Sequence, residues 1–207
     1  MLKAREALSR LREGNRRFAN GETTTRELSN TARRLELMEG QAPFAIILGC
    51  SDSRVPAELV FDQGFGDLFV IRVAGNVVAP SQVGSVEFAA SRYGTRLVVV
   101  MGHSQCGAII ATLEELQGVE AAHSENLRDI VDRVSPSVET VLSIMRGASQ
   151  EELVHAAVRA NVRASVDHLR HGSELLEKLV DETGLLIVGA EYSLETGVVD
   201  FFDSVPD

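Results

Sequence analysis

Apolar positions along the chain fall into two patterns: short continuous runs and longer stretches with a helical period. The short runs predict buried β-strands at residues 44–48, 67–72, 97–101 and 185–189, with an edge strand at 198–202. Helical periods separate them, at residues 57–61, 84–93, 107–116 and across 124–180. Because strands alternate with helices, we predict an α/β fold: a mostly parallel four-stranded sheet with an antiparallel edge strand, flanked by helices.

The first 40 residues follow a different pattern. One helix is predicted over about residues 2–19, and a second over residues 25–38, ending at Gly40. We therefore expect an N-terminal helical arm (residues 1–40) ahead of a single α/β domain (residues 41–207).

Capping signals divide the long helical stretch between residues 124 and 180. Ser135-Pro136 predicts a break or a fresh helix start, and Ser149-Gln150-Glu151-Glu152 has the sequence of a capping box that starts a new helix. Gly172 predicts where that helix stops.

Composition places the chain among ordinary globular proteins, with 44% hydrophobic and 24% charged residues in a length of 207. No apolar run approaches the roughly 20 residues of a membrane span, and the N-terminus lacks the apolar stretch of a signal peptide. We therefore expect a cytoplasmic protein that binds no membrane. In that reducing compartment, two cysteines indicate metal ligands or catalytic groups rather than a disulfide.

Charge is distributed unevenly. The net charge is −10, yet residues 1–40 contain nine Lys/Arg and six Asp/Glu, so the remainder carries −13. A mildly basic arm ahead of an acidic body favours packing of the arm on an acidic surface, its own or that of a partner subunit. A solvated helix face is the alternative. A nucleic-acid partner is disfavoured, because the arm has a single aromatic residue and interspersed acids.

Both cysteines follow predicted buried strands. Cys50 comes after the run at residues 44–48, and His103-Ser104-Gln105-Cys106 comes after the run at 97–101. Ligands of parallel sheets bind beyond the carboxyl ends of the strands, so these side chains are expected to converge. Two thiolates and one imidazole supply three of the four ligands of a tetrahedral zinc site. Two small buried hydrophobes are the alternative for the cysteines.

Asp52 has two possible partners. It can be the fourth metal ligand, which closes the site, or it can pair with Arg54, because residues two apart in an extended stretch point the same way. In the paired state the fourth position is open to water, and a zinc ion there lowers the pKa of bound water to about 7.

Three further positions are candidates for substrate contacts. The predicted helix start at Gly107-Ala108 offers free backbone N–H groups that suit a small anion such as bicarbonate. Phe69 and Phe88 could form the apolar wall that a small neutral substrate needs. Ordinary core packing is the alternative for both rings.

The paired motifs resemble the signature of β-class carbonic anhydrases. They are Cys50-Ser51-Asp52-Ser53-Arg54-Val55 and Gly102-His103-Ser104-Gln105-Cys106-Gly107. Phe69-Val70-Ile71-Arg72-Val73-Ala74-Gly75-Asn76 and Gly84-Ser85-Val86-Glu87-Phe88-Ala89 are also similar to that family. The resemblance is strong over residues 41–113 and continues through residues 189–192.

The resemblance implies reversible hydration of carbon dioxide to bicarbonate and a proton by zinc-bound hydroxide, with one zinc ion per chain. It implies Cys50, His103 and Cys106 as zinc ligands. Asp52 would be the fourth ligand in a closed state and, with Arg54, the catalytic dyad that gates and orients the metal-bound water in an open state.

The resemblance also implies a substrate-binding glutamine at Gln41, nine positions before Cys50, and aromatic pocket positions at Phe69 and Phe88. Family members form homodimers and often homotetramers, in which the N-terminal arm embraces the neighbouring subunit. Some bacterial members carry a regulatory bicarbonate site of Trp, Arg and Tyr. Arg72 and Tyr192 match two of these positions, but Ile47 occupies the Trp position, so the resemblance does not extend to that site.

The same residues are also compatible with other classes of function, each of which needs a further feature. Hydrolysis of carbon disulfide or carbonyl sulfide would use the same scaffold with narrowed access. A cysteine phosphatase or sulfurtransferase would need an Arg six positions after the cysteine, where the chain has Pro56 and Thr112. A structural zinc domain or a bicarbonate-binding regulator would keep Asp52 permanently on the metal.

Overall fold

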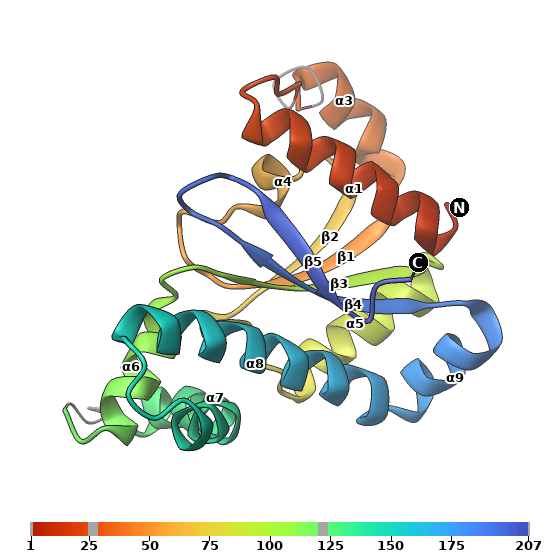
Figure 1. Ribbon diagram of the computed structural model, residues 1–207. Helices are drawn as coiled ribbons and strands as arrows, with labels where there is room; N and C mark the ends of the chain where they lie inside the picture. The colour runs from red at the N-terminus through yellow and green to blue at the C-terminus, as the bar shows by residue number, and fades with distance from the viewer. Residues whose placement is uncertain (1, 25–28, 120–123, 207) are drawn as a thin grey trace.

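The centre of the computed structural model is a five-stranded sheet with the strand order β2–β1–β3–β4–β5 (Figure 1). The first four strands of this order are parallel, and β5 is antiparallel to β4. This arrangement confirms the predicted α/β fold. The structure describes residues 2–24, 29–119 and 124–206. The strands are β1 (Ala45–Gly49), β2 (Leu68–Arg72), β3 (Leu97–His103), β4 (Leu186–Tyr192) and β5 (Val199–Asp203).

Helices cover both faces of the sheet, because alternate residues of each strand point to opposite faces. On one face, Ile47 and Val99 contact α1 (Ala4–Ala19) and α4 (Ala57–Val60) through a shared core. On the other face, Ile46 and Val98 belong to a second core. The helices of that second core are α5 (Pro80–Arg92), α8 (Gln150–His171) and α9 (Glu174–Thr183).

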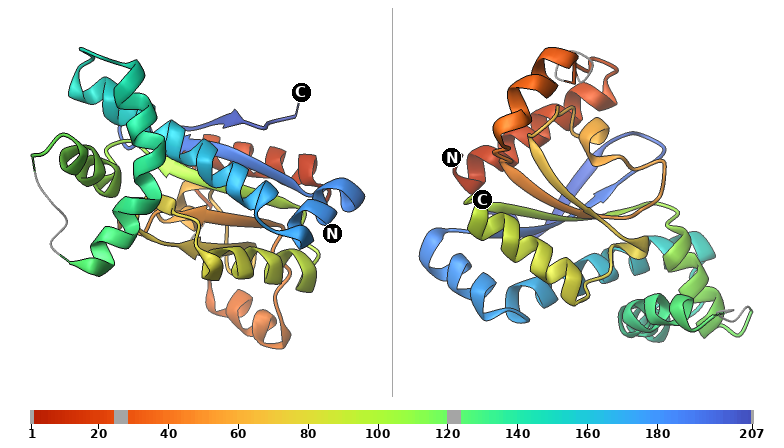
Figure 2. Two further views of the ribbon diagram at one scale, coloured as in Figure 1. Left: turned by 90° about the horizontal axis from the view of Figure 1, so that it is seen from below. Right: turned by 180° about the vertical axis from the view of Figure 1, so that it is seen from behind.

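A third group of helices lies beyond the carboxyl ends of the strands. It consists of α6 (Gly107–Leu116), α7 (Glu125–Ile144) and the first half of α8, which share a core of their own. Figure 2 shows α6 and α7 projecting from this end of the sheet. The two cysteines belong to this core, so the metal-ligand candidates lie between the sheet and the projecting helices.

Helix α7 contradicts one prediction, because it continues without interruption across Pro136. Proline removes one backbone donor and leaves the carbonyl of Asp132 without its helical partner. Asp132 is exposed, so water can satisfy that carbonyl. The buried stripe of the helix, which includes Val134 and Val138, holds both sides of the proline on the same core. By contrast, the predicted capping box at Ser149 and the helix stop at Gly172 are confirmed.

The N-terminal arm consists of two unlike parts. Helix α1 buries Leu8 and Leu11 on the sheet of its own chain. The second predicted helix is observed as α3 (Thr31–Glu36) followed by a short 3-10 helix, η1 (Leu37–Glu39), and it ends at Gly40 as expected. Its predicted first turn, at residues 25–28, lies outside the described residues. Neither α3 nor η1 buries any side chain. The domain boundary at residue 40 remains a prediction.

Within the described part of the chain, no helix combines the length and the apolarity needed to cross a membrane.

Candidate metal centre

The turns that follow β1 and β3 place two cysteines and one histidine at the same edge of the sheet. Cys50 directly follows the last residue of β1, and His103 is the last residue of β3. Gln105 then adopts a left-handed conformation with a φ of 54°, which turns the chain so that Cys106 precedes α6 as its N-cap. Because β1 and β3 are paired in the sheet, the two turns lie side by side.

The three side chains form a buried cluster of ligand atoms. The Sγ atoms of Cys50 and Cys106 are 3.9 Å apart, and these sulfurs and a ring nitrogen of His103 lie within 4.8 Å of one another. Nδ1 of His103 is 2.9 Å from the carbonyl oxygen of Ser104. This contact assigns the ring proton to Nδ1 and leaves Nε2 with a free lone pair. Nε2 is buried and has no hydrogen-bond partner among the described residues, which is the orientation that metal-binding histidines adopt.

The surroundings of the two sulfurs favour thiolate at Cys50 and thiol at Cys106. The thiol of Cys106, 3.9 Å away, has the strongest influence on the pKa of Cys50, and the neighbouring His103 ring and the backbone of Asp52 and Gly75 act in the same direction. Against the opposing effect of burial, they lower the pKa of Cys50 to about 4. The hydrogen bond to Cys50, burial and the charge on Cys50 raise the pKa of Cys106. Thiolate is the form of cysteine that binds metals.

The first turn of α6 begins beside the sulfur of Cys106. The backbone of Ile109 and Ala108 acts to lower the pKa of Cys106, against the larger effects that raise it, because the N-cap side chain lies at the positive end of the helix dipole. The binding of a small anion by the amides of Gly107 and Ala108 remains a prediction. Gly107 is exposed, and its contact with substrate remains a prediction.

The cluster fits a zinc ion. Two zinc–sulfur bonds of about 2.3 Å at a tetrahedral angle would separate the sulfurs by about 3.8 Å, and the observed separation is 3.9 Å. The unpaired Nε2 of His103 faces the same cluster. Two sulfurs and one imidazole nitrogen are typical zinc ligands, and three protein ligands leave a fourth position for water or for a further side chain.

Asp52 and Arg54 form the predicted pair. Nε of Arg54 donates to Oδ1 of Asp52 at 2.9 Å and Nη2 donates to Oδ2 at 2.7 Å, and the backbone N–H of Arg54 adds a bond of 2.9 Å to Oδ1. The side-chain hydrogen bonds from Arg54 hold the pKa of Asp52 well below its usual range. Oδ2 of Asp52 also lies 3.9 Å from Nε2 of His103. The paired carboxylate therefore borders the cluster of ligand atoms.

Arg72 anchors the backbone of this turn, a role that the sequence did not reveal. From the end of β2 its Nε donates to the carbonyl of Cys50 at 2.9 Å, and its Nη2 donates to the carbonyl of Asp52. The available signal was a charged residue at the end of a buried strand, but only the pairing of β2 with β1 brings it to Cys50. Ile47, at the position of the regulatory Trp, is completely buried in the core. Tyr192 is also buried, and its ring lies 6.3 Å from that of Phe18.

The three remaining candidates lie elsewhere in the same chain. Gln41 precedes β1, whereas Cys50 follows it, and the five residues of this strand extend about 16 Å. Nε2 of Gln41 donates to the hydroxyl of Tyr93 at 3.0 Å. The rings of Phe69, Phe88 and Tyr93 are all within 6.2 Å of one another, centroid to centroid. These residues form one aromatic cluster. Tyr93 was not among the predicted residues, because nothing in its spacing links it to Gln41.

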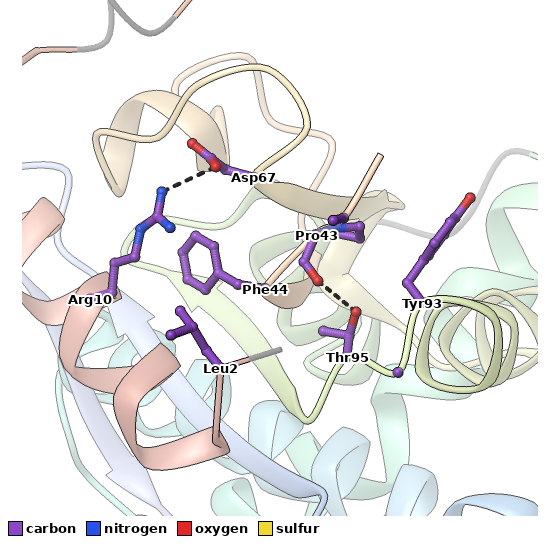
Figure 3. Close-up of a pocket in the computed structure, with 9 residues that line it drawn as sticks. Leu2, Arg10, Pro43, Phe44, Asp67, Tyr93 and Thr95 are labelled. Carbon is purple, nitrogen blue, oxygen red and sulfur yellow. Dashed lines mark hydrogen bonds and ion pairs between the residues drawn. The ribbon is translucent and has the colours of Figure 1, made fainter. Parts of the chain in front are cut away.

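A hollow of about 370 Å³ adjoins this cluster at Tyr93 (Figure 3). Arg10 and Asp67 form an ion pair of 3.1 Å on one side of it, and Thr95 donates to the carbonyl of Pro43 at 2.7 Å on the other. These polar groups already bind one another or the backbone. The hollow is therefore a feature of the surface beside the aromatic cluster and contributes no group to the metal centre.

Comparisons with known proteins agree on one family. A family model described as carbonic anhydrase matches residues 45–199. A carbonic anhydrase of Mycolicibacterium smegmatis is 38% identical over 197 residues, which cover 95% of this chain and 92% of that protein. The β-carbonic anhydrase CafA of Aspergillus fumigatus is similar in structure, with a TM-score of 0.75 and 25% identity over 98% of this chain and 92% of that one. One of two β-carbonic anhydrases of Sordaria macrospora, described as tetrameric, has a TM-score of 0.73 and 23% identity, covering 96% of this chain and 95% of that one.

Proposed function

The chain belongs to the β-carbonic anhydrase family, and we infer that it hydrates carbon dioxide reversibly to bicarbonate and a proton at a zinc ion bound by Cys50, His103 and Cys106. The observation that carries this inference is the buried Nε2 of His103, which lacks a partner and faces two sulfurs 3.9 Å apart. When bound, zinc would act as a Lewis acid that makes water a nucleophile near neutral pH.

Asp52 would orient the attacking water. Its carboxylate is held by three hydrogen bonds from Arg54, so it is ionised and fixed in direction. An ionised carboxylate can only accept hydrogen bonds, so it would select the water orientation that points a proton at Asp52 and a lone pair at carbon dioxide. Arg54 would serve as the positioning partner of Asp52.

The same pair would also control access to the fourth ligand position. Oδ2 of Asp52 is 3.9 Å from Nε2 of His103, so a small movement of the carboxylate would bring it into the ligand cluster. Arg54 opposes this movement as long as its bidentate bonds persist. Loss of the pair would convert Asp52 into a ligand and exclude water.

Gln41, Phe69 and Phe88 would complete the substrate pocket of a second copy of the chain. They are separated from Cys50 in their own chain by the length of β1, yet Gln41 and Phe88 are exposed. A side chain that binds substrate must face the nucleophile, and across a two-fold axis the cluster of one protomer can reach the metal centre of the other. The proposed enzyme is therefore a homodimer or a dimer of dimers.

The second part of the N-terminal arm would contribute to the contact between protomers. Leu35 and Met38, in α3 and η1, are 55% and 78% exposed, and Phe65 is 46% exposed. The backbone carbonyl of Phe65 accepts a bond from Arg33 of α3, so these apolar side chains belong to one region. A short helix with no buried residue gains stability only when another surface covers it.

Stopped-flow measurement of carbon dioxide hydration on zinc-quantified protein tests the proposal. Rapid turnover that disappears on zinc removal and returns with zinc is the expected result. Zinc-loaded protein without turnover would contradict it. The same assay with carbon disulfide and carbonyl sulfide separates the related hydrolase activities, and zinc content separates the cysteine-phosphatase alternative.

A further inference from the structure

The backbone beside Cys50 is held by a helix that contributes no candidate ligand. The loop η2 (Ala74–Asn76) follows β2 and lies next to the turn of Cys50: the N–H of Ser51 donates to the carbonyl of Val73 at 3.3 Å, and a Cβ atom added at Gly75 would lie 3.1 Å from that of Ala108, at the start of α6. Gly75 and Asn76 both have left-handed conformations, with φ of 66° and 44°. Two successive left-handed residues do not extend any regular element, so other contacts must fix them.

Helix α8 provides those contacts from one of its faces. Nδ2 of Asn161 donates to the carbonyl of Gly75 at 2.8 Å, and Oγ of Ser165 donates to the carbonyl of Asn76 at 3.3 Å. Asn161 is 3% exposed and Ser165 is 5% exposed. The two residues are one helical turn apart, so they meet consecutive carbonyls of the loop. A buried amide is costly unless it is bonded, and Nδ2 of Asn161 is bonded to this loop.

The position of α8 is itself tied to the strand that carries His103. A Cβ atom added at Gly102 would lie 2.7 Å from a methyl group of Val162 and 3.0 Å from one of Val158. Both valines belong to α8 and are buried. The absence of a side chain at Gly102 therefore lets α8 lie directly against the end of β3. One helix thus fixes the strand end that bears one ligand and the loop that lies beside the turn of another.

We propose that Asn161 is a positioning residue for the metal centre: by holding the carbonyl of Gly75, it fixes the loop η2 between the turn of Cys50 and the start of α6. A loop fixed in this way would keep the turn of Cys50 in the orientation that binds the metal, as outer-shell partners of metal ligands do. Ser165 supports the same loop one residue further along. This proposal rests on the proposed metal binding by Cys50, His103 and Cys106.

The test compares zinc affinity in matched variants, measured by competition with a chromophoric chelator. Asn161→Leu keeps the approximate size of the side chain and removes the donor, and it is expected to weaken zinc binding about 10–100-fold. Val166→Ala is the control, because Val166 is buried on the same helix but packs in the core under the sheet. It is expected to lower the thermal midpoint while leaving the zinc dissociation constant unchanged.

Two further measurements keep the test decisive. If Asn161→Leu does not fold, the zinc affinity of Asn161→Ala is measured instead, in the same chelator competition. In the cobalt-substituted protein, the sulfur-to-metal charge-transfer band is expected to shift in the Asn161 variant and to remain in place in Val166→Ala.

The outcomes separate the two proposals. Wild-type protein that fails to bind zinc overturns both. Wild-type protein that binds zinc, together with an Asn161 variant whose affinity lies within twofold of it and whose cobalt band is unchanged, overturns the role of Asn161 alone.

Discussion

Oδ2 of Asp52 lies 3.9 Å from Nε2 of His103, close to the ligand cluster but outside the distance of a metal-bound pair. Arg54 holds the carboxylate there through two side-chain bonds of 2.9 and 2.7 Å. From this geometry follow the proposed roles, in which the cysteines and the histidine bind the metal and Asp52 orients water. Substitutions of single residues test these roles.

Replacing Asp52 by Asn should lower the rate of carbon dioxide hydration by about 10²-fold or more, because the amide loses the charge that accepts the hydrogen bond from the water. Zinc content should stay unchanged. Asp129→Asn is a matched control, since Asp129 forms a similar carboxylate–guanidinium pair with Arg133 on the exposed face of α7. Equal or higher activity in Asp52→Asn would contradict the proposed role of this residue.

Removing the metal should abolish activity and destabilise the fold. A ligand at 100 times its dissociation constant stabilises the native state by about 2.7 kcal/mol, so a chelator should lower the thermal midpoint, and zinc should restore it. Cys50→Ser should behave like chelated protein and should not respond to added zinc. A thermal midpoint that is identical with and without zinc would argue against metal binding by the folded chain.

A mixture of two inactive variants should regain activity if the site is shared between protomers. Cys50→Ser damages the metal centre and Gln41→Ala damages the substrate cluster. In a mixed dimer, one site combines an intact Cys50 with the intact Gln41 of the second copy, so co-expression should restore about a quarter of the sites. Activity no higher than the average of the two separate variants would mean that Gln41 does not serve a neighbouring protomer.

Met38→Asp should weaken self-association, because Met38 is 78% exposed beside Leu35 and a charge there would be buried in the proposed interface. The expected result in sedimentation equilibrium is a shift towards the monomer, with a parallel loss of activity at low protein concentration. Ile144→Asp is the control, since Ile144 is 74% exposed at the end of α7, away from the arm. Equal dissociation of both variants would place the interface elsewhere.

Ser149→Ala should lower the thermal midpoint by about 2–4 °C at pH 7 by removing the capping box of α8. Hydrogen bonds from the backbone and hydroxyl of Ser149 lower the pKa of Glu152. A lowered folded-state pKa gives stability that is complete above the unfolded value and is lost as pH falls through the folded value. The difference in thermal midpoint between Ser149→Ala and the wild type should therefore shrink below about pH 4. Thermal melts across the acid range measure this difference. A difference in thermal midpoint that stays the same at every pH would exclude the carboxylate of Glu152 as the source of the lost stability.

The sequence by itself determined the strand and helix order, the α/β class and the convergence of Cys50, His103 and Cys106. Those features could be predicted because apolar runs, glycines and capping residues act locally, and because the carboxyl ends of parallel strands must meet at one edge. The prediction of a break at Pro136 was wrong because local chain geometry was outweighed by the buried stripe of α7, to which Val134 and Val138 belong.

Only the tertiary structure decided which groups surround the ligands. Arg72 reaches the carbonyl of Cys50 through the pairing of β2 with β1, and Asn161 reaches Gly75 across 86 positions of sequence. In the structure, Gln41 and Phe88 also lie apart from Cys50 of the same chain, in the aromatic cluster with Tyr93. Such contacts depend on the distance between elements that are remote in sequence. Those distances follow from the packing of the whole core, which no local pattern encodes.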